Sequence, residues 1–239
     1  MKKILILAMK TIAVLILFAF IAVSFCRLNE YNKGKNDSRR VVQEVVTETE
    51  HQPALISVDF DRLREKNSDI IAWLYCPDTP INYAIVQTTD NDYYLRRGLD
   101  KKYSYSGTLF ADFRNAGDFT DENTIIYGHN MKNESMFGTL VNYERQEYFD
   151  KYPEMHLITP TAAYRIKLIA GVKETGTAKL FEDFLNPQKI EKYIKENVAR
   201  STFRSGYDYS ENDRFVTFST CLYEYDDARY ILIGKLEKS

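Results

Sequence analysis

The sequence predicts a mainly β protein, a closed β-barrel with helices on its outside that follows a transmembrane helix. Short runs rich in β-branched and aromatic residues recur along the chain, and turn clusters such as TTDND and RNAGD separate them. Few helical segments interrupt these runs, and many short strands with few helices are typical of closed barrels. An apolar segment precedes them at the N-terminus.

The N-terminal apolar segment, residues 4–26, contains one charged residue, Lys10. As a helix rising about 1.5 Å per residue, it is long enough to cross the roughly 30 Å hydrocarbon core of a membrane. We therefore expect residues 1–26 to be an uncleaved membrane anchor. A cleaved signal peptide is the alternative, because residues 22–24 (Ala-Val-Ser) resemble a cleavage site, although residues 11–26 alone exceed a usual signal-peptide core.

The charges that flank the apolar segment do not decide its orientation. Lys2 and Lys3 favour a cytoplasmic N-terminus, whereas a group of basic residues after the segment favours the opposite. That group consists of Arg27, Lys33, Lys35, Arg39 and Arg40. An extracytoplasmic domain is expected from the chemistry described below rather than from this comparison.

Residues 27–56 are polar and charged, with few large apolar side chains. Such a segment is typical of a disordered stalk that holds a domain away from a membrane, and a partial helix is expected over residues 41–49. The sequence therefore divides into an anchor over 1–26, a stalk over 27–56 and a globular domain over 57–239.

The globular domain begins with residues 57–76, whose spacing suggests one or two short helices with Ser57 as N-cap. Helices are also expected over 133–149 and over 186–200, where Pro187 stands early and apolar residues recur at helical spacing. Strands are expected over residues 81–87, 106–113, 123–129, 155–160, 163–174, 213–221 and 229–237.

Composition limits the classes of function. A chain of 239 residues suffices for one large or two small domains, and its 44% hydrophobic and 28% charged residues are ordinary for a globular protein. The net charge of −2 lacks the basic excess of proteins that bind polyanions. Nucleic acid is therefore not an expected partner.

The three cysteines, Cys26, Cys76 and Cys221, do not make a disulfide framework. Cys76 lies in a mixed apolar run and is interpreted as a small buried hydrophobic residue. Cys221 ends a predicted strand, and strand alternation puts it on one face with the hydroxyls of Thr217 and Ser219. This stretch alone fits both a core residue and a nucleophile.

A nucleophilic thiol needs a base, because a free cysteine with its pKa near 8.5 is mostly protonated at neutral pH. The chain has three histidines, and His129 ends the strand expected over 123–129. Gly128 before it leaves room for a close approach of backbone segments. Without further information, a histidine at a strand end is more often a structural or merely exposed residue than a catalytic one.

Arg229 begins the strand that follows Cys221 after the acidic turn EYDDA, a spacing that suits a hairpin. Taken alone, this arginine is explained as the ion-pair partner of Asp226 or Asp227. The acidic turn is interpreted as solvated rather than metal-binding, because the histidines of the chain lack ligand spacing.

Taken in order along the chain, these segments resemble the sortase family. TFSTC, residues 217–221, resembles the Thr-Leu-x-Thr-Cys signature of sortases, and YGHNM, residues 127–131, resembles the segment with the sortase histidine. DDARYILIGKL resembles the strand with the sortase arginine. Two segments before the histidine, GTLFADFRN and INYAIVQTTDNDYYL, resemble class B sortases, and so does the helix over 187–200 between the last long strands. The resemblance covers about residues 58–238, and Phe218 stands where the family usually has Leu, on the face opposite the cysteine.

The resemblance implies an eight-stranded sortase barrel and a membrane-anchored transpeptidase on the outer face of the cell membrane of Gram-positive bacteria. Such enzymes cut a sorting signal near the C-terminus of a secreted protein after its Thr, and they join the resulting thioacyl group to an amine of the cell-wall peptide. By position, Cys221 would be the nucleophile, His129 the acid and base, and Arg229 the cation that steadies the oxyanion. No cofactor or metal is implied.

Three further residues are predicted to contact the substrate. Ser219 shares the face of the cysteine, Thr220 precedes the cysteine, and Tyr127 shares the face of His129. Class B relatives often favour Asn-Pro-x-Thr-like signals, but no pattern in the sequence specifies the sorting motif, the acceptor amine or the cargo.

Two alternatives use the same residues differently. A surface cysteine peptidase would form the same thioacyl intermediate and release it to water. An anchored surface module without activity would keep Cys221 as a buried residue that resists alkylation.

Overall fold

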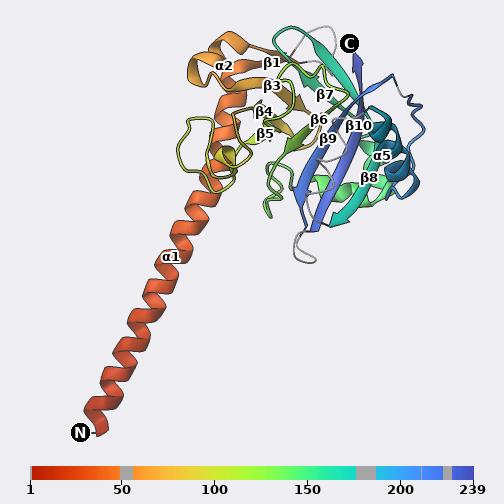
Figure 1. Cartoon of the computed structure of the whole chain (residues 1–239). Coiled ribbons are helices and arrows are strands. Elements are labelled where there is room, and N and C mark those ends of the chain that lie inside the picture. Colours follow the sequence, from red (N-terminus) through yellow and green to blue (C-terminus); the bar gives the residue numbers. More distant parts are fainter. Residues whose placement is uncertain (1, 49–55, 176–186, 211, 223–227) are drawn as a thin grey trace.

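Eight strands close into a barrel in the computed structural model, in the order β10-β8-β7-β3-β4-β5-β6-β9 with β9 paired back to β10 (Figure 1). The predicted eight-stranded closed barrel is confirmed. The strands are β3 (Ile70–Tyr75), β4 (Asn82–Val86), β5 (Leu109–Ala111), β6 (Asn123–Tyr127), β7 (Glu154–Ile158), β8 (Ala163–Thr175), β9 (Arg214–Cys221) and β10 (Ala228–Lys238). The structure describes residues 2–48, 56–175, 187–210, 212–222 and 228–239.

Two of the barrel pairings are parallel, β4 with β5 and β6 with β9, and the others are antiparallel. Because β6 and β9 run in the same direction, their carboxyl ends, at Tyr127 and Cys221, lie at one end of the barrel. β10 runs in the opposite direction and begins at that same end with Ala228 and Arg229. The topology thus gathers three segments that are far apart in the sequence.

Alternation along the strands separates the interior of the barrel from its outer surface. On β9, Val216 and Phe218 belong to the barrel core, and Phe218 meets the ring of Phe137 edge to face with centroids 5.6 Å apart. Phe215 faces outward and belongs to a separate cluster with residues of α5 (Pro187–Ala199). The face of β9 that carries Cys221 is therefore the outer face of the barrel.

Helices lie on the outside of the barrel, as expected (Figure 1). α5 packs against the outer face of β8, through buried Ile190 and Ile194. α2 (Phe60–Lys66) and the end of α1 (Lys2–Val45) lie on another outer face, near buried Trp73. The remaining short helices are η1 (Tyr93–Arg96), η2 (Leu140–Glu144) and α3 (Gln146–Lys151).

The segment expected to be a disordered stalk is helical over most of its length. α1 continues to Val45, which is buried, and is followed by β1 (Val46–Glu48), which pairs with β2 (Ile56–Val58). Three valines near its end, at positions 41, 42 and 45, supply apolar surface against the domain, and this tertiary packing stabilises the helix. The division into anchor, stalk and catalytic domain stays a prediction.

Three local expectations were wrong. Residues 57–76 were expected to form one or two short helices without a strand, but they contain the barrel strand β3 after α2. Ser57 lies in β2, and the N-cap of α2 is Asp59, whose carboxylate accepts a hydrogen bond from the backbone N–H of Arg62 at 3.0 Å. Residues 133–149 form a turn, η2 and α3 rather than one helix. The chain folds back within this turn, where Asn130 and Met136 form a β-bridge.

α1 contains one stretch long and apolar enough to cross a membrane, Met9–Asn29. It is 21 residues long, and none of its most apolar window is buried against the rest of the protein. The helix projects away from the barrel toward the N-terminus (Figure 1). From Asn29 to Val45 it continues for about 24 Å, at about 1.5 Å per residue.

Candidate active site

Cys221 and Arg229 face each other across the antiparallel pair β9 and β10. The two residues are register partners, and Nη1 of Arg229 donates to Sγ of Cys221 at 3.6 Å. Both side chains are half-buried. The predicted alternative for Arg229, an ion pair with Asp226 or Asp227, involves residues outside the described part of the chain.

The segment that carries His129 is hydrogen-bonded to the strand that carries Cys221. The N–H of Gly128 donates to the carbonyl of Ser219 at 3.2 Å, and the hydroxyl of Thr220 donates to the carbonyl of Gly128 at 2.9 Å. One residue beyond His129, Nδ2 of Asn130 donates to the carbonyl of Cys221 at 2.9 Å. These bonds lie on both sides of His129 and hold it beside the end of β9.

Gly128 is required here by space. A Cβ atom at this position would lie 2.4 Å from Cδ2 of Leu109 and 2.6 Å from Cδ2 of Phe137. Both are side-chain atoms of fully buried core residues, so they cannot move away without disturbing the barrel interior. The close packing fixes the course of the backbone into His129.

A main-chain carbonyl orients the imidazole of His129. Nε2 lies 2.8 Å from the carbonyl oxygen of Leu95, in η1. A carbonyl oxygen only accepts, so Nε2 carries the hydrogen and Nδ1 is the ring nitrogen left for proton transfer. Burial lowers the pKa of His129, and the positive charges of Arg96 and Arg229 lower it further, whereas the hydrogen bond to Leu95 raises it.

The three predicted substrate contacts lie beside these groups but are buried. Thr220 is fully buried, and its hydroxyl is engaged with Gly128. Ser219 is 1% exposed, and within the described residues its hydroxyl has no hydrogen-bond partner. Tyr127 pairs with Ser219 in register, is 8% exposed and donates its hydroxyl to Oδ2 of Asp112 at 3.1 Å. Their contact with substrate stays a prediction.

Several residues around the site were not found from the sequence. The carbonyl of Leu95 is a main-chain group, so the type of residue at this position does not point to it. Asp112 and Asn91 occur in segments that were noted only for their family resemblance. The signal that would have pointed to Asp112 is a carboxylate directly after a buried strand, in the run ADFRN.

The other cysteines and histidines lie elsewhere. Cys76 is buried, and burial raises the pKa of its thiol to about 11, whereas Cys26 is exposed on α1. His156 lies on β7, and His51 falls outside the described residues. In the part of the chain that the structure describes, no three His, Cys, Asp or Glu side chains gather as a metal site would require.

A thiol, an imidazole and a guanidinium at one end of adjacent barrel strands form the kind of arrangement used by cysteine enzymes that act through acyl transfer. Sortase B of Listeria monocytogenes is 32% identical over 211 residues, which cover 87% of this chain and 86% of that protein. The chain belongs to the sortase B family of cysteine transpeptidases. No protein-family model matches the chain.

Solved structures agree with this assignment. Sortase B from Bacillus anthracis in complex with AAEK1 superimposes with a TM-score of 0.77 at 28% identity, covering 89% of this chain and all of that chain. A Staphylococcus aureus sortase B-substrate complex has a TM-score of 0.70 at 28% identity, covering 75% of this chain and 84% of that chain.

Proposed function

We propose that this transpeptidase is anchored in the membrane by α1 and joins secreted proteins to the cell wall. It cleaves a C-terminal sorting signal after Thr through a thioacyl intermediate and transfers the acyl group to an amine of a peptidoglycan precursor or cross-bridge. The observation that carries the proposal is the contact of Arg229 with the Cys221 thiol at the end of β9, beside the segment that holds His129.

In the first half of the reaction, Cys221 loses its proton to Nδ1 of His129, and its sulfur attacks the Thr carbonyl carbon. Nη1 of Arg229 lies beside the reacting sulfur, and the N–H donors of this guanidinium can hold the oxyanion of the tetrahedral intermediate. The scissile C–N bond then breaks, and the leaving amine takes the proton from His129. Cys221 is left as a thioester of the Thr carbonyl.

In the second half, the acceptor amine attacks the thioester carbonyl carbon and gives its proton to His129. The C–S bond breaks, a new amide bond forms, and the proton returns to Cys221. The lowered pKa of His129 favours the neutral ring at rest, which is the form that can accept the thiol proton. The bond from Nε2 to Leu95 keeps Nδ1 free for both transfers.

The N-terminal helix supports the proposed location. The stretch Met9–Asn29 has the length and composition of a membrane span. The helix between Asn29 and Val41, the first of the valines that pack against the domain, would hold the catalytic domain about 18 Å from the membrane edge, at about 1.5 Å per residue. We place the domain outside the cell, where secreted proteins and cell-wall amines meet. External protease added to intact cells should then degrade the domain. Complete protection of the domain would show that it lies on the cytoplasmic side instead.

Product analysis tests the reaction itself. The full chain in detergent would be offered a peptide library with a fixed internal Thr, with and without added triglycine. We expect cleavage after Thr and, with the amine, a product in which the N-terminal fragment is joined to triglycine. Hydrolysed fragment alone, at an unchanged rate in both reactions, would instead identify a surface cysteine peptidase. The Cys76→Ala variant is the matched control and should behave as the unaltered chain.

A further inference from the structure

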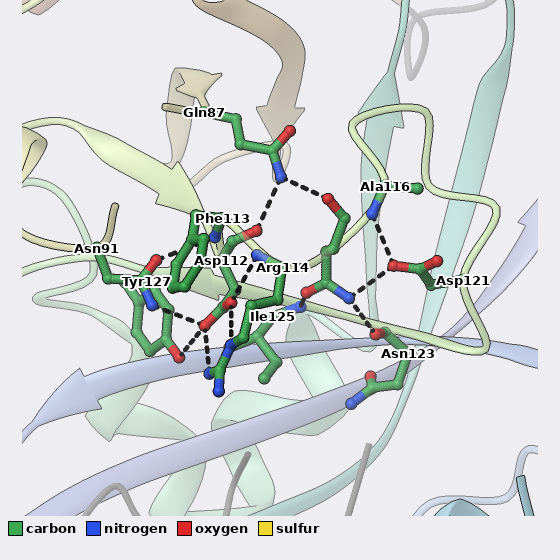
Figure 2. A network of polar contacts seen from close by, with 11 residues as sticks. Gln87, Asn91, Asp112, Phe113, Arg114, Ala116, Asp121, Asn123, Ile125 and Tyr127 are labelled. Atoms are coloured by element: carbon green, nitrogen blue, oxygen red, sulfur yellow. Dashed lines mark hydrogen bonds and ion pairs between the residues drawn. The ribbon is translucent and has the colours of Figure 1, made fainter. Parts of the chain in front are cut away.

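Asp112 is a buried carboxylate at the end of β5 that accepts hydrogen bonds from three different segments. It is 1% exposed. Its Oδ2 accepts from Nδ2 of Asn91 at 2.8 Å and from the hydroxyl of Tyr127 at 3.1 Å. Both oxygens are also bound by Arg114, through Nε at 2.8 Å and Nη2 at 3.0 Å. Figure 2 shows these groups converging on the carboxylate.

The ion pair with Arg114 explains how the fold tolerates this carboxylate. A buried charge is costly unless it is paired and its remaining lone pairs accept hydrogen bonds. Arg114 provides two parallel N–H bonds, and its backbone N–H adds a third at 3.0 Å. With its charge paired in this way, the carboxylate can also accept from the two remaining donors, Asn91 and Tyr127.

The first of those donors leads to His129. Asn91 is held at both ends of its amide, because its Oδ1 also accepts from the backbone N–H of Phe113 at 3.0 Å. η1 begins two residues after Asn91, and within it the carbonyl of Leu95 accepts from Nε2 of His129. Asp112 is thereby connected to the imidazole of His129 through the side chain of Asn91 and the short helix η1.

The second donor leads to the strand that ends at His129. Tyr127 stands on β6 two residues before His129 and pairs in register with Ser219 of β9. Burial raises the pKa of the Tyr127 hydroxyl, and the charge of Asp112 raises it further, so this hydroxyl stays a donor. The carboxylate of Asp112 is therefore hydrogen-bonded both to the segment before η1, which contacts the imidazole of His129, and to β6, which leads into His129.

We propose that Asp112 is a positioning residue for the transpeptidase reaction: it holds η1 against β6 so that the Leu95 carbonyl fixes the tautomer and orientation of His129. The inference rests on the proposed acid and base role of His129. Asp112 contacts neither Cys221 nor Arg229 in the hydrogen bonds and ion pairs found among the described residues, and it acts through Asn91 and Tyr127.

The test is the Asp112→Asn variant of the full chain in detergent, with histidines labelled with ¹⁵N. An amide puts N–H donors where the carboxylate accepts, so it cannot satisfy Arg114, Asn91 and Tyr127 together. The ring-nitrogen shifts of His129 report directly which nitrogen carries the hydrogen. His156, on β7, is the internal reference. Asp121→Asn is the matched control, because Asp121 accepts from Asn115 and Ala116 in the same polar network but not from Asn91 or Tyr127 (Figure 2).

We expect the unaltered chain and Asp121→Asn to show His129 with its hydrogen on Nε2. Asp112→Asn should show a mixture of tautomers and a lower pKa for His129, because the bond to Leu95 is lost while Arg96 and Arg229 remain. kcat/KM should fall by on the order of 100-fold, the effect of a displacement of about 1 Å at a reacting group. Asn91→Leu breaks the same link and leaves the Asp112–Arg114 pair, so it serves if Asp112→Asn fails to fold.

An unchanged His129 tautomer and pKa in folded Asp112→Asn or Asn91→Leu would overturn the inference, and so would an equal loss of activity in Asp121→Asn. These spectra are recorded without substrate, so they do not depend on the catalytic role of His129. Full activity of a His129→Ala variant would refute that role and leave the measured coupling between Asp112 and the imidazole in place.

Discussion

Nη1 of Arg229 lies 3.6 Å from Sγ of Cys221, because the two residues are register partners on β10 and β9. An arginine at such a site presents a rigid, planar fork of donors, whereas a lysine presents a single point charge. The register of the strand pair therefore places Nη1 beside the sulfur.

Replacing Arg229 should reduce turnover far more than stability. Loss of one oxyanion donor typically costs on the order of 10²–10³-fold in turnover, and both Arg229→Ala and Arg229→Lys should show such losses. Turnover of a cleavable signal peptide and the melting temperature would be measured together. Arg165→Ala is the control, because Arg165 is half-exposed and pairs with Glu154 at the surface, where a salt bridge contributes roughly 0–1 kcal/mol. Near-normal turnover of Arg229→Ala would remove this residue from the site.

The buried and half-buried cysteines should differ in reactivity. At pH 8 iodoacetamide should modify Cys221 in the folded chain and leave Cys76 intact, since a pKa of about 11 leaves roughly one part in a thousand of Cys76 as thiolate. Cys76→Ala should keep most of the activity and lose about 1 kcal/mol of stability. Mass spectrometry of peptides locates the label. Faster modification of Cys76 than of Cys221 would contradict the placement of these thiols.

Stability should fall as the pH is lowered from about 7 to 5. Burial lowers the pKa values of His129 and His156 below the ordinary value of 6.5, so the unfolded chain binds more protons in this range. The neutral rings favour the folded state above pH 6.5, and that contribution is lost as the pH falls toward the folded-state pKa values. Melting temperatures of His129→Gln should show a shallower decrease over this range. An identical slope in the variant and the unaltered chain would exclude a contribution from His129.

The end of α1 should belong to the folded domain. Val45 is 4% exposed, and the carbonyl of Glu44 accepts from Nη1 of Arg62 at 2.9 Å. A chain that begins at residue 56 loses this packing and the β1–β2 pairing, whereas one that begins at residue 38 keeps both. Loss of a buried valine alone costs roughly 1.5–3 kcal/mol, so the shorter chain should melt roughly 5 °C or more below the longer one. Equal melting temperatures would show that the segment does not stabilise the domain.

Much of the fold could be predicted because the alternation of side chains along a strand is visible in the sequence. Cys221, Phe215 and Ser219 share a face in the sequence pattern, and the register of β9 puts that face outside the barrel. The pattern could not show that residues 46–48 pair with residues 56–58, since strands of three residues carry too little periodicity. It also could not choose Asp59 over Ser57 as the N-cap, because both are good capping residues.

The same contrast holds at the site. Cys221, His129 and Arg229 were proposed from the ends of predicted strands together with the family resemblance. The parallel pairing of β6 and β9 that brings two of them together depends on the closure of the barrel, which no local pattern encodes. The group that orients His129 is the main-chain carbonyl of Leu95. Every residue type carries this carbonyl, so the identity of residue 95 could not indicate its role.

Trapping of the acyl-enzyme tests the central claim most directly. The full chain in detergent, incubated with an Asn-Pro-x-Thr-type signal peptide and no amine, would be analysed by intact-mass and peptide-mapping mass spectrometry. We predict an adduct with the mass of the peptide fragment ending at Thr, located on Cys221, absent from Cys221→Ala and discharged when triglycine is added. Product formation by Cys221→Ala, or an adduct on another residue, would contradict the account.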